Sequence, residues 1–316
     1  MADVVTGATS AVSSGQLSNQ VLTAYDRVAY FALRAGLVFD QLSDVRPGNV
    51  TSPGNPVKFL IWSELSAATT ALTENVDVDA VGLSDSLITV TPAEYGNAVV
   101  KTLRIMTDDF LVGFDADVAN LVAYNMVNTI DTLARTALDG GTNVNYRAHT
   151  AETQITATGD LTVALVRTQE ANLRANAAMP WDMSNYMAII HPHVAFDLKS
   201  ETGDGAWTVA AEYSDASRIW NNEIGTFAGF RFLESPRALL TTDGGTSAVD
   251  TYTTYFLGRQ ALAKAESVPA HIVIGPVTDH LRRFATIGWH IYAGWDSFRE
   301  AALYRVITAS TMGSNS

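Results

Sequence analysis

Residues 55–63 have the sequence NPVKFLIWS, residues 86–91 have SLITVT, and residues 108–138 have DDFLVGFDADVANLVAYNMVNTIDTLARTAL. The first two runs are rich in β-branched and aromatic residues, so they predict the two strands of a hairpin. In the third run apolar residues recur at helical spacing without a proline, which predicts one long helix. At 1.5 Å per residue this helix would be about 45 Å long. A hairpin followed by such a helix cannot bury both of its faces against itself, so we expect it to lie on neighbouring copies of the chain.

The segment that joins the two predicted strands is acidic and has no compensating base. It is therefore either solvated, as an ordinary acidic loop would be, or faces positive groups on another chain. Trp62 is a candidate anchor for a neighbouring subunit, because aromatic residues often carry the binding energy of interfaces. Burial of Trp62 within its own domain is the alternative. The candidate contact residues between subunits are Lys58, Trp62, Glu64, Glu74, Asp77, Asp79 and Asp85.

The composition describes an ordered chain with a sparsely charged surface. Of 316 residues, 47% are hydrophobic and 17% are charged, whereas about 25% charged residues is typical. Part of this surface is expected to be hidden between subunits. The net charge is −13, with four lysines and scattered arginines. Because nucleic-acid readers need a basic stripe to replace phosphate counterions, tight direct binding to DNA is not expected.

Cysteine is absent, which excludes disulfides, thiolate metal sites and a cysteine nucleophile. No run approaches the roughly 18 to 20 apolar residues of a membrane helix, and the first twenty residues lack the basic start and apolar core of a secretion signal. We therefore expect a soluble cytoplasmic product with no membrane partner.

The remaining chain alternates between helical and extended patterns, which indicates an α+β protein. Helices are predicted over residues 19–44, 160–177, 192–201 and 208–222. Strands are predicted over residues 97–105, 186–190, 225–234, 251–260, 272–274, 284–292 and 302–309. The last three strands are expected to form an antiparallel sheet under the long helix, with Trp289 and Trp295 on the face that packs against it.

His191-Pro192-His193, with Asp197 four residues later, is the one local cluster that suggests metal binding. Two imidazoles at the end of a strand can share one ion, and a metal-dependent hydrolase would need a third ligand from elsewhere. Pro192 instead favours a strand-to-helix corner in which the rings diverge and one histidine caps the helix. We expect the structural corner and no metal site.

Other catalytic patterns are missing from the sequence. There is no Gly-x-Ser-x-Gly elbow and no phosphate-binding loop of the Gly-x-Gly-x-x-Gly or Walker type. Asp108 and Asp109 are adjacent on the predicted helix and therefore splay apart. We expect no catalytic residue and no cofactor, and nothing in the sequence demands an enzyme.

Two stretches in the second half of the chain resemble a known family. The first is YMAIIHPHVAFDL at residues 186–198, followed by WNNEIG at residues 220–225 and FRFLESP at residues 230–236. The second is PVTDHL at residues 276–281, followed by Arg283, Thr286, Gly288 and Trp289. These blocks resemble the HK97-type major capsid proteins of tailed bacteriophages. The first half is similar in the order of its elements.

This resemblance implies a domain layout. It would give an N-terminal arm over residues 1–50 and an extended E-loop over residues 51–96. The P-domain would comprise residues 97–140 and 263–316, with the long helix as its spine, and the A-domain would comprise residues 141–262.

The resemblance also implies a function in the virion. Pentamers and hexamers would close into an icosahedral shell around genomic DNA. Separate scaffolding and portal proteins, and a decoration protein, are the partners it implies. Lys58 could serve as a cross-link partner, although contacts between subunits are expected to be non-covalent. An encapsulin-like compartment that encloses cargo enzymes has the same fold and remains the alternative.

Overall fold

The computed structural model describes residues 37–47, 54–72, 74, 77–78, 80–102, 114–182, 184–201, 223–274 and 283–312. These residues belong to two compact units, each of which is described by itself. The first unit comprises Gly96–Met126 and Ala270–His290, and the second comprises Ala35–Tyr95, Val127–Pro269 and Ile291–Ser316, within the described ranges. The predicted helices over residues 19–36 and 208–222 lie outside the described residues.

The described residues form three sheets. A two-stranded sheet pairs β2 (Val57–Trp62) with β3 (Asp85–Val90). A four-stranded sheet has the order β1 (Ser43–Pro47), β11 (Leu262–Ile274), β12 (Phe284–Ser297) and β4 (Ala93–Thr102). A seven-stranded sheet contains β5 (Val144–Asn145), β13 (Leu303–Thr308), β10 (Thr251–Leu257), β6 (Tyr186–Ile190), β8 (Phe230–Glu234) and β7 (Glu223–Phe227), with β9 (Leu240–Thr241) paired to β10.

Three α-helices and three short 3-10 helices complete the described elements. The α-helices are α4 (Phe114–Asp139), α5 (Val163–Ala175) and α6 (Pro192–Ser200). The 3-10 helices are η1 (Asp40–Leu42), η2 (Glu152–Gln154) and η5 (Glu300–Ala302). Within the described part of the chain, no helix combines the length and the apolar character that crossing a bilayer requires.

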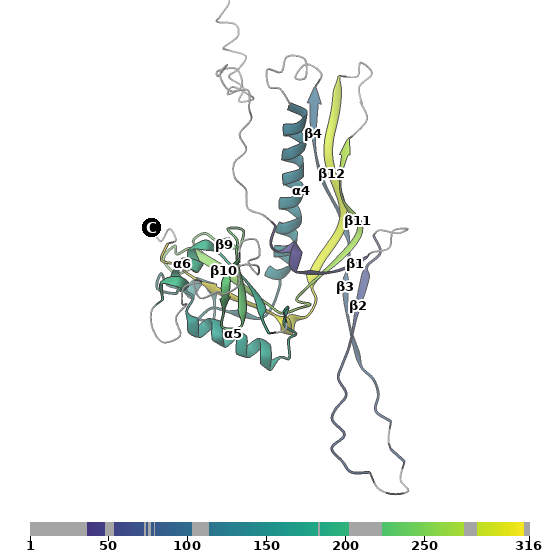
Figure 1. Cartoon of the computed structure of the whole chain (residues 1–316), viewed down its shortest axis with the longest axis vertical. Helices are drawn as coiled ribbons and strands as arrows, with labels where there is room; N and C mark the ends of the chain where they lie inside the picture. Colours follow the sequence, from purple (N-terminus) through teal and green to yellow (C-terminus); the bar gives the residue numbers. More distant parts are fainter. Residues whose placement is uncertain are drawn as a thin grey trace, which may run out of the picture. The chain divides into compact units, whose positions relative to one another are not determined.

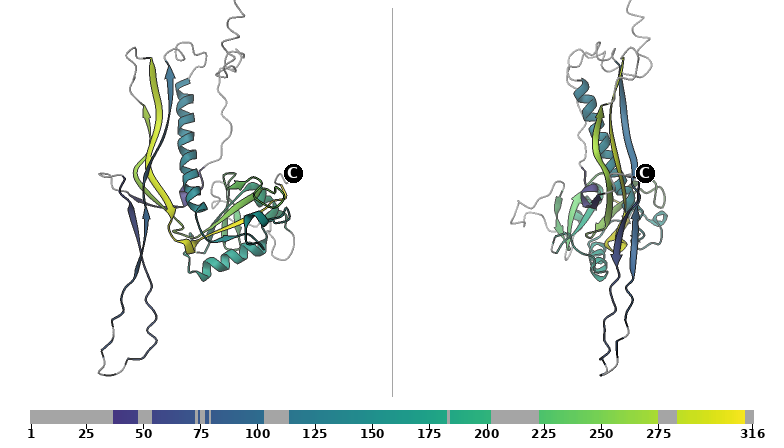
Figure 2. Two further views of the ribbon diagram at one scale, coloured as in Figure 1. Left: turned by 180° about the vertical axis from the view of Figure 1, so that it is seen from behind. Right: turned by 90° about the vertical axis from the view of Figure 1, so that its right-hand side faces the viewer.

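The predicted long helix is confirmed as α4, which has 26 residues. In the first unit its N-terminal half runs alongside β4 and β12 (Figures 1 and 2). Asn125 of the helix fixes this arrangement, because its side-chain oxygen accepts a hydrogen bond from Trp289 Nε1 at 2.8 Å and one from Asn97 Nδ2 at 3.3 Å. Trp289 therefore lies on the helix-facing side of β12, as predicted.

The core of the second unit is the seven-stranded sheet, with α5 and α6 packed beside it (Figure 1). β6 is buried at every position, as expected for a strand with helices near it. Aromatic rings fill the centre, where Phe230 and Phe256 meet edge to face at 4.8 Å. The predicted helices over residues 160–177 and 192–201 are confirmed as α5 and α6.

Three predictions about these elements are wrong. Residues 302–309 do not join the sheet beside the long helix, because β13 pairs with β10 and β5 in the seven-stranded sheet. Residues 225–234 form two strands, since Ala228 and Gly229 take positive φ angles of 45° and 74° and turn the chain between β7 and β8. Residues 37–44 do not form an α-helix, and instead contain the 3-10 helix η1 and the start of β1.

A buried carboxylate joins η1 to α4 in the second unit. Asp131 is 1% exposed. Its Oδ1 accepts hydrogen bonds from the backbone N–H groups of Val38 at 3.1 Å and Phe39 at 2.8 Å. Its Oδ2 lies 2.9 Å from Nη1 of Arg237. This carboxylate caps η1, satisfies donors that would otherwise be buried without partners, and is neutralised by an arginine.

Trp295 does not share the helix contact predicted for it. In the second unit its indole N–H donates to Asp40 of η1 at 2.9 Å, and the ammonium of Lys264 lies 5.4 Å from its ring centroid. The ring therefore packs on a short ion-paired turn, because Lys264 also bonds Asp40 at 3.2 Å.

Candidate subunit interface

The predicted hairpin is confirmed, and the structure gives its register. Val57 pairs with Val90, Leu60 with Leu87, and Trp62 with Asp85. Side chains alternate between the two faces of a strand, so this register separates the hairpin into two faces of different character. Figures 1 and 2 show β2 and β3 side by side, with the connecting segment running on past the paired strands.

The inner face of the hairpin is anchored to the second unit. Phe59 is 4% exposed and packs with Val90, Ala263, Ala265 and Phe298. Its ring centroid lies 5.1 Å from that of Phe298, within the range of favourable aromatic pairs. The guanidinium of Arg46 lies 5.7 Å from the same ring. The base of the hairpin is thus held by an apolar cluster on β11.

The outer face of the hairpin is exposed and carries three large apolar side chains among polar ones. Leu60 and Leu87 stand directly opposite each other and are each 48% exposed, while Trp62 is 62% exposed. Beyond the paired strands, more large apolar side chains are exposed: Leu65, Leu72, Val78, Val81 and Leu83. So many exposed large apolar side chains on one element indicate a surface that binds another protein. Burial of Trp62 within its own chain, the alternative above, is wrong.

The charged candidates lie on the same element. Lys58, Glu64, Glu74, Asp77 and Asp85 are all exposed. Trp62 and Asp85 are brought together as a cross-strand pair, and Lys58 lies opposite Thr89. Asp77 accepts a hydrogen bond from the N–H of Val78 at 2.9 Å. Asp79 lies outside the described residues.

Sequence reasoning missed the pair formed by Leu60 and Leu87. The two-residue period of a strand could have indicated half of it. Leu60 is two residues from Trp62 and next to Phe59, so it lies on the same face as Trp62. The identity of Leu87 as its cross-strand partner depends on the pairing register of the two strands, which the sequence alone left open.

The His191 corner is structural, and the predicted capping histidine is confirmed. His191 is the N-cap of α6, and its Nδ1 accepts a hydrogen bond from the N–H of His193 at 3.2 Å. Nδ1 of His193 lies 2.9 Å from the hydroxyl of Tyr252. The prediction that the two rings diverge is wrong, because their centroids lie 4.8 Å apart and the imidazoles meet edge to face at 84°. Among the described residues, no group of three or more metal-ligating side chains is brought together.

Burial, and to a smaller extent the neighbouring His193, lower the pKa of His191 to about 4. The imidazole is therefore neutral at physiological pH, which keeps its Nδ1 available as a hydrogen-bond acceptor. Asp197, the third residue of the motif, accepts hydrogen bonds from the N–H of Thr311 at 3.0 Å and from its hydroxyl. It fixes the end of the described chain, and it does not form a metal-ligating group with the two histidines.

A hairpin with an anchored base and exposed large apolar side chains is suited to binding other protein chains. The model of the phage capsid protein family matches residues 15–308. This chain belongs to the phage capsid protein family. It is a structural capsid protein, and its place is the virion capsid.

Solved capsid structures have the same fold. The capsid of Ralstonia phage GP4 aligns with a TM-score of 0.68 at 12% identity, covering 92% of this chain and 96% of that one. The capsid of cyanophage P-SCSP1u aligns with a TM-score of 0.69 at 13% identity, covering 92% and 94%. The fold of this capsid protein is therefore the HK97-like capsid fold, and the predicted fold class is confirmed.

The capsid of a gene transfer agent particle also aligns, with a TM-score of 0.61 at 12% identity over 94% of this chain and 98% of that one. No curated protein matches the chain in sequence. The capsid family and its structural neighbours do not support the encapsulin-like alternative. The similarity to these capsids implies that copies of this chain assemble into multimeric shells.

Proposed function

We propose that this capsid protein closes into an icosahedral shell of pentamers and hexamers around phage DNA, using the hairpin as its main arm between subunits. The observation that carries the proposal is the exposed apolar outer face of the hairpin, formed by Leu60, Trp62 and Leu87. Burying one such side chain is worth roughly 1.5 to 3 kcal/mol, so repeated copies of this contact would hold a shell together.

The proposal assigns the elements to the domains of the fold. Residues 1–50 act as the arm and residues 51–96 as the E-loop. Residues 97–140 with β11 and β12 form the P-domain. Residues 141–262 form the A-domain together with β13, which lies in the same sheet as β10.

Further partners follow from this assignment. A separate scaffolding protein would guide closure in the host cytoplasm, a portal protein would occupy one vertex, and a decoration protein could reinforce the shell. The net charge of −13 suits a container that must not stick to the DNA packed within it. Contacts between subunits, including those near Lys58, would be non-covalent.

Deletion of residues 65–85 tests the role of the hairpin. The variant should keep the far-ultraviolet circular dichroism of a folded chain but form no particles in electron micrographs. Normal particles from this variant would contradict the proposed role. Analysis of the contents of native particles separates the two kinds of shell, because a genome container should hold DNA and a cargo compartment should hold protein.

A further inference from the structure

The side chain of Arg46 lies on the hairpin side of β1. Arg46 is paired with Ala265 in the parallel ladder of β1 and β11, and paired residues on neighbouring strands point to the same face of a sheet. That face of β11 also carries Ala263, two residues earlier. Both alanines are fully buried and pack with Phe59. The Phe59 socket is formed by four buried residues: Val90, Ala263, Ala265 and Phe298.

The guanidinium of Arg46 lies over the ring of Phe59. Its central carbon is 5.7 Å from the ring centroid, within the roughly 6 Å of a favourable contact between a cation and an aromatic face. Arg46 is exposed, whereas Phe59 is 4% exposed. Among the described residues, no carboxylate forms an ion pair with Arg46. The attraction of its charge is therefore directed to the ring.

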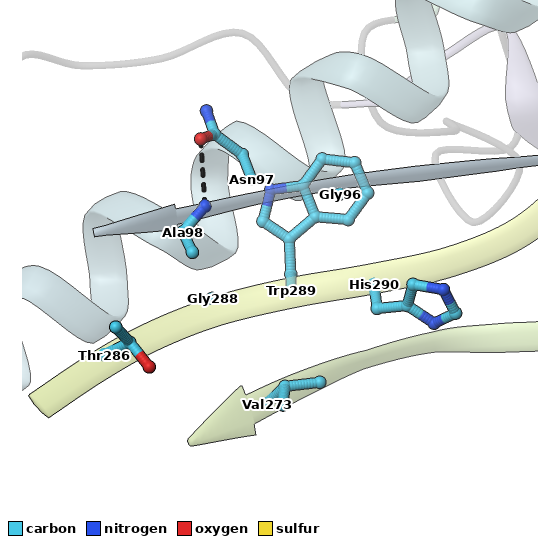
Figure 3. Close-up of a pocket in the computed structure, with 8 residues that line it drawn as sticks. All are labelled: Gly96, Asn97, Ala98, Val273, Thr286, Gly288, Trp289 and His290. Carbon is cyan, nitrogen blue, oxygen red and sulfur yellow. Dashed lines mark hydrogen bonds between the residues drawn. The ribbon is translucent and has the colours of Figure 1, made fainter. Parts of the chain in front are cut away.

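The β3 end of the hairpin is held by strand pairing. β3 leads into β4 after Thr91 and Pro92, and β4 pairs with β12 in the four-stranded sheet. A Cβ on Gly294 would lie 2.6 Å from the carbonyl oxygen of Thr91, so the two chains are in close contact at this end. The same two strands are equally close where a Cβ on Gly288 would lie 2.8 Å from the carbonyl oxygen of Asn97 (Figure 3). Movement of the hairpin is therefore expected at β2.

The other strand of the hairpin, β2, has no such backbone support. β2 and β3 form a sheet of their own, and among the described residues no strand of the other two sheets pairs with β2. A two-stranded hairpin by itself is marginally stable in water. The position of β2 therefore depends on side-chain contacts, chiefly those of Phe59 with its socket and with Arg46.

We propose that Arg46 is a positioning residue for assembly, which keeps Phe59 in its socket and so fixes the direction in which the hairpin presents Leu60 and Trp62. Arg46 acts through the Phe59 ring on the inner face of the hairpin, while Leu60 and Trp62 lie on the outer face. This inference rests on the proposed role of the hairpin in assembly and adds the residue that sets the position of the hairpin.

A single buried thiol measures how often Phe59 leaves its socket, because the chain has no cysteine of its own. Ala265→Cys places the thiol in the socket, at a fully buried position. The rate of its alkylation by iodoacetamide is measured in the unassembled chain, with and without Arg46→Gln. Arg46→Gln should raise the rate about two- to fivefold, the effect of losing roughly 0.5 to 1 kcal/mol. Arg46→Lys keeps a cation over the ring and should restore most of the protection.

Two controls separate this local effect from a general one. Ala188→Cys places a thiol at a fully buried position of β6, where Arg46→Gln should leave the alkylation rate unchanged. Lys199→Gln removes an exposed cation from α6 and should not affect the thiol of Ala265→Cys. Ala263→Cys gives the same measurement at the other alanine of the socket, should Ala265→Cys fail to fold.

Two alkylation results would overturn the inference. The first is an equal rate at the socket with and without Arg46→Gln. The second is an equal rise for Ala188→Cys, because Arg46 would then act on the stability of the whole chain and not on the seating of Phe59.

Particle yields test whether Arg46 acts through the ring. Arg46→Gln should lower the yield of particles by at least the same two- to fivefold factor, and the double variant Arg46→Gln/Phe59→Leu should give the same yield as Phe59→Leu alone. An unchanged yield for Arg46→Gln would overturn the inference. Losses that multiply in the double variant would also overturn it, because Arg46 would then contact something other than Phe59.

The proposed function fails by a different result, namely normal particles after deletion of residues 65–85. In that case the alkylation rates still decide whether Arg46 holds the base of the hairpin. Failure of the inference and failure of the proposed function are therefore distinguishable.

Discussion

His191 fixes a corner of the capsid protein through a single lone pair. Its Nδ1 accepts from the N–H of His193 and so caps α6, directly after the buried strand β6. Only the neutral ring can accept at this nitrogen. Burial makes the charged form costly and lowers the pKa to about 4, so the cap and the burial act in the same direction.

The stability of the folded chain should therefore depend on this ring at acid pH. In the unfolded chain the imidazole has a pKa of about 6.5. Between pH 6.5 and pH 4 the unfolded chain binds a proton that the folded chain does not, so stability is fully present above pH 6.5 and falls as pH drops to 4. His191→Asn keeps an N-cap acceptor without titrating. Denaturant unfolding at pH 7 and pH 4.5 should show a smaller loss of stability for the variant, and equal losses would contradict this.

Asp131 is expected to be the most sensitive charged residue of the second unit. Asp131→Ala removes the carboxylate that pairs with Arg237 and accepts from the N–H groups of Val38 and Phe39. Breaking a buried ion pair in this way costs about 3 to 5 kcal/mol. Denaturant unfolding of the unassembled chain should show this loss, with a smaller one for Asp131→Asn, whose amide oxygen still accepts. The exposed control Glu74→Ala should stay within about 0.5 kcal/mol of the parent chain.

At the scale of the element, the two faces of the hairpin should respond differently to substitution. Leu60→Ser/Leu87→Ser alters only exposed positions, so the stability of the unassembled chain should change by about 0.5 kcal/mol or less. Particle formation should be lost, because the apolar contact between subunits is gone. Phe59→Ala should instead cost about 3 to 5 kcal/mol, since it empties the cluster around Phe298. Unfolding curves and particle yields of both variants separate the two effects.

The sequence predicted the elements of this fold better than their partners. α4 and the hairpin follow from local periodicity, which the sequence displays directly. The partner of β13 does not, because Leu303 and Val306 are fully buried and would suit either sheet. Their pairing with β10 depends on residues about fifty positions away.

For the candidate interface, too, the sequence predicted the residues better than their pairing. Trp62 and its acidic neighbours were identified by residue type and position along the chain. The pair formed by Leu60 and Leu87 was not, because these residues meet only once β2 and β3 are placed in register. The apolar residues of the two predicted strands were the available signal, and the register of the pair was the missing information.

At the scale of the whole molecule, assembly must overcome repulsion between like-charged subunits. Each copy carries a net charge of −13, so the approach of a second copy is opposed at long range. In the proposed shell the contacts that hold subunits together are therefore short-range, between apolar side chains such as Trp62. Repulsion over long distances is screened by salt, whereas contact between buried apolar surfaces is not.

This balance predicts how assembly depends on ionic strength. The Debye length falls from about 30 Å at 0.01 M to about 8 Å at 0.15 M, so the yield of particles from purified chain should rise over this interval. Trp62→Ala should lower the yield at both ends of the range by a similar factor, because the loss of an apolar anchor is insensitive to screening. Light scattering and sedimentation of the two proteins across the salt series provide the measurement. A yield that falls steadily with added salt would mean that attraction between opposite charges, and not apolar contact, drives the association of these acidic chains.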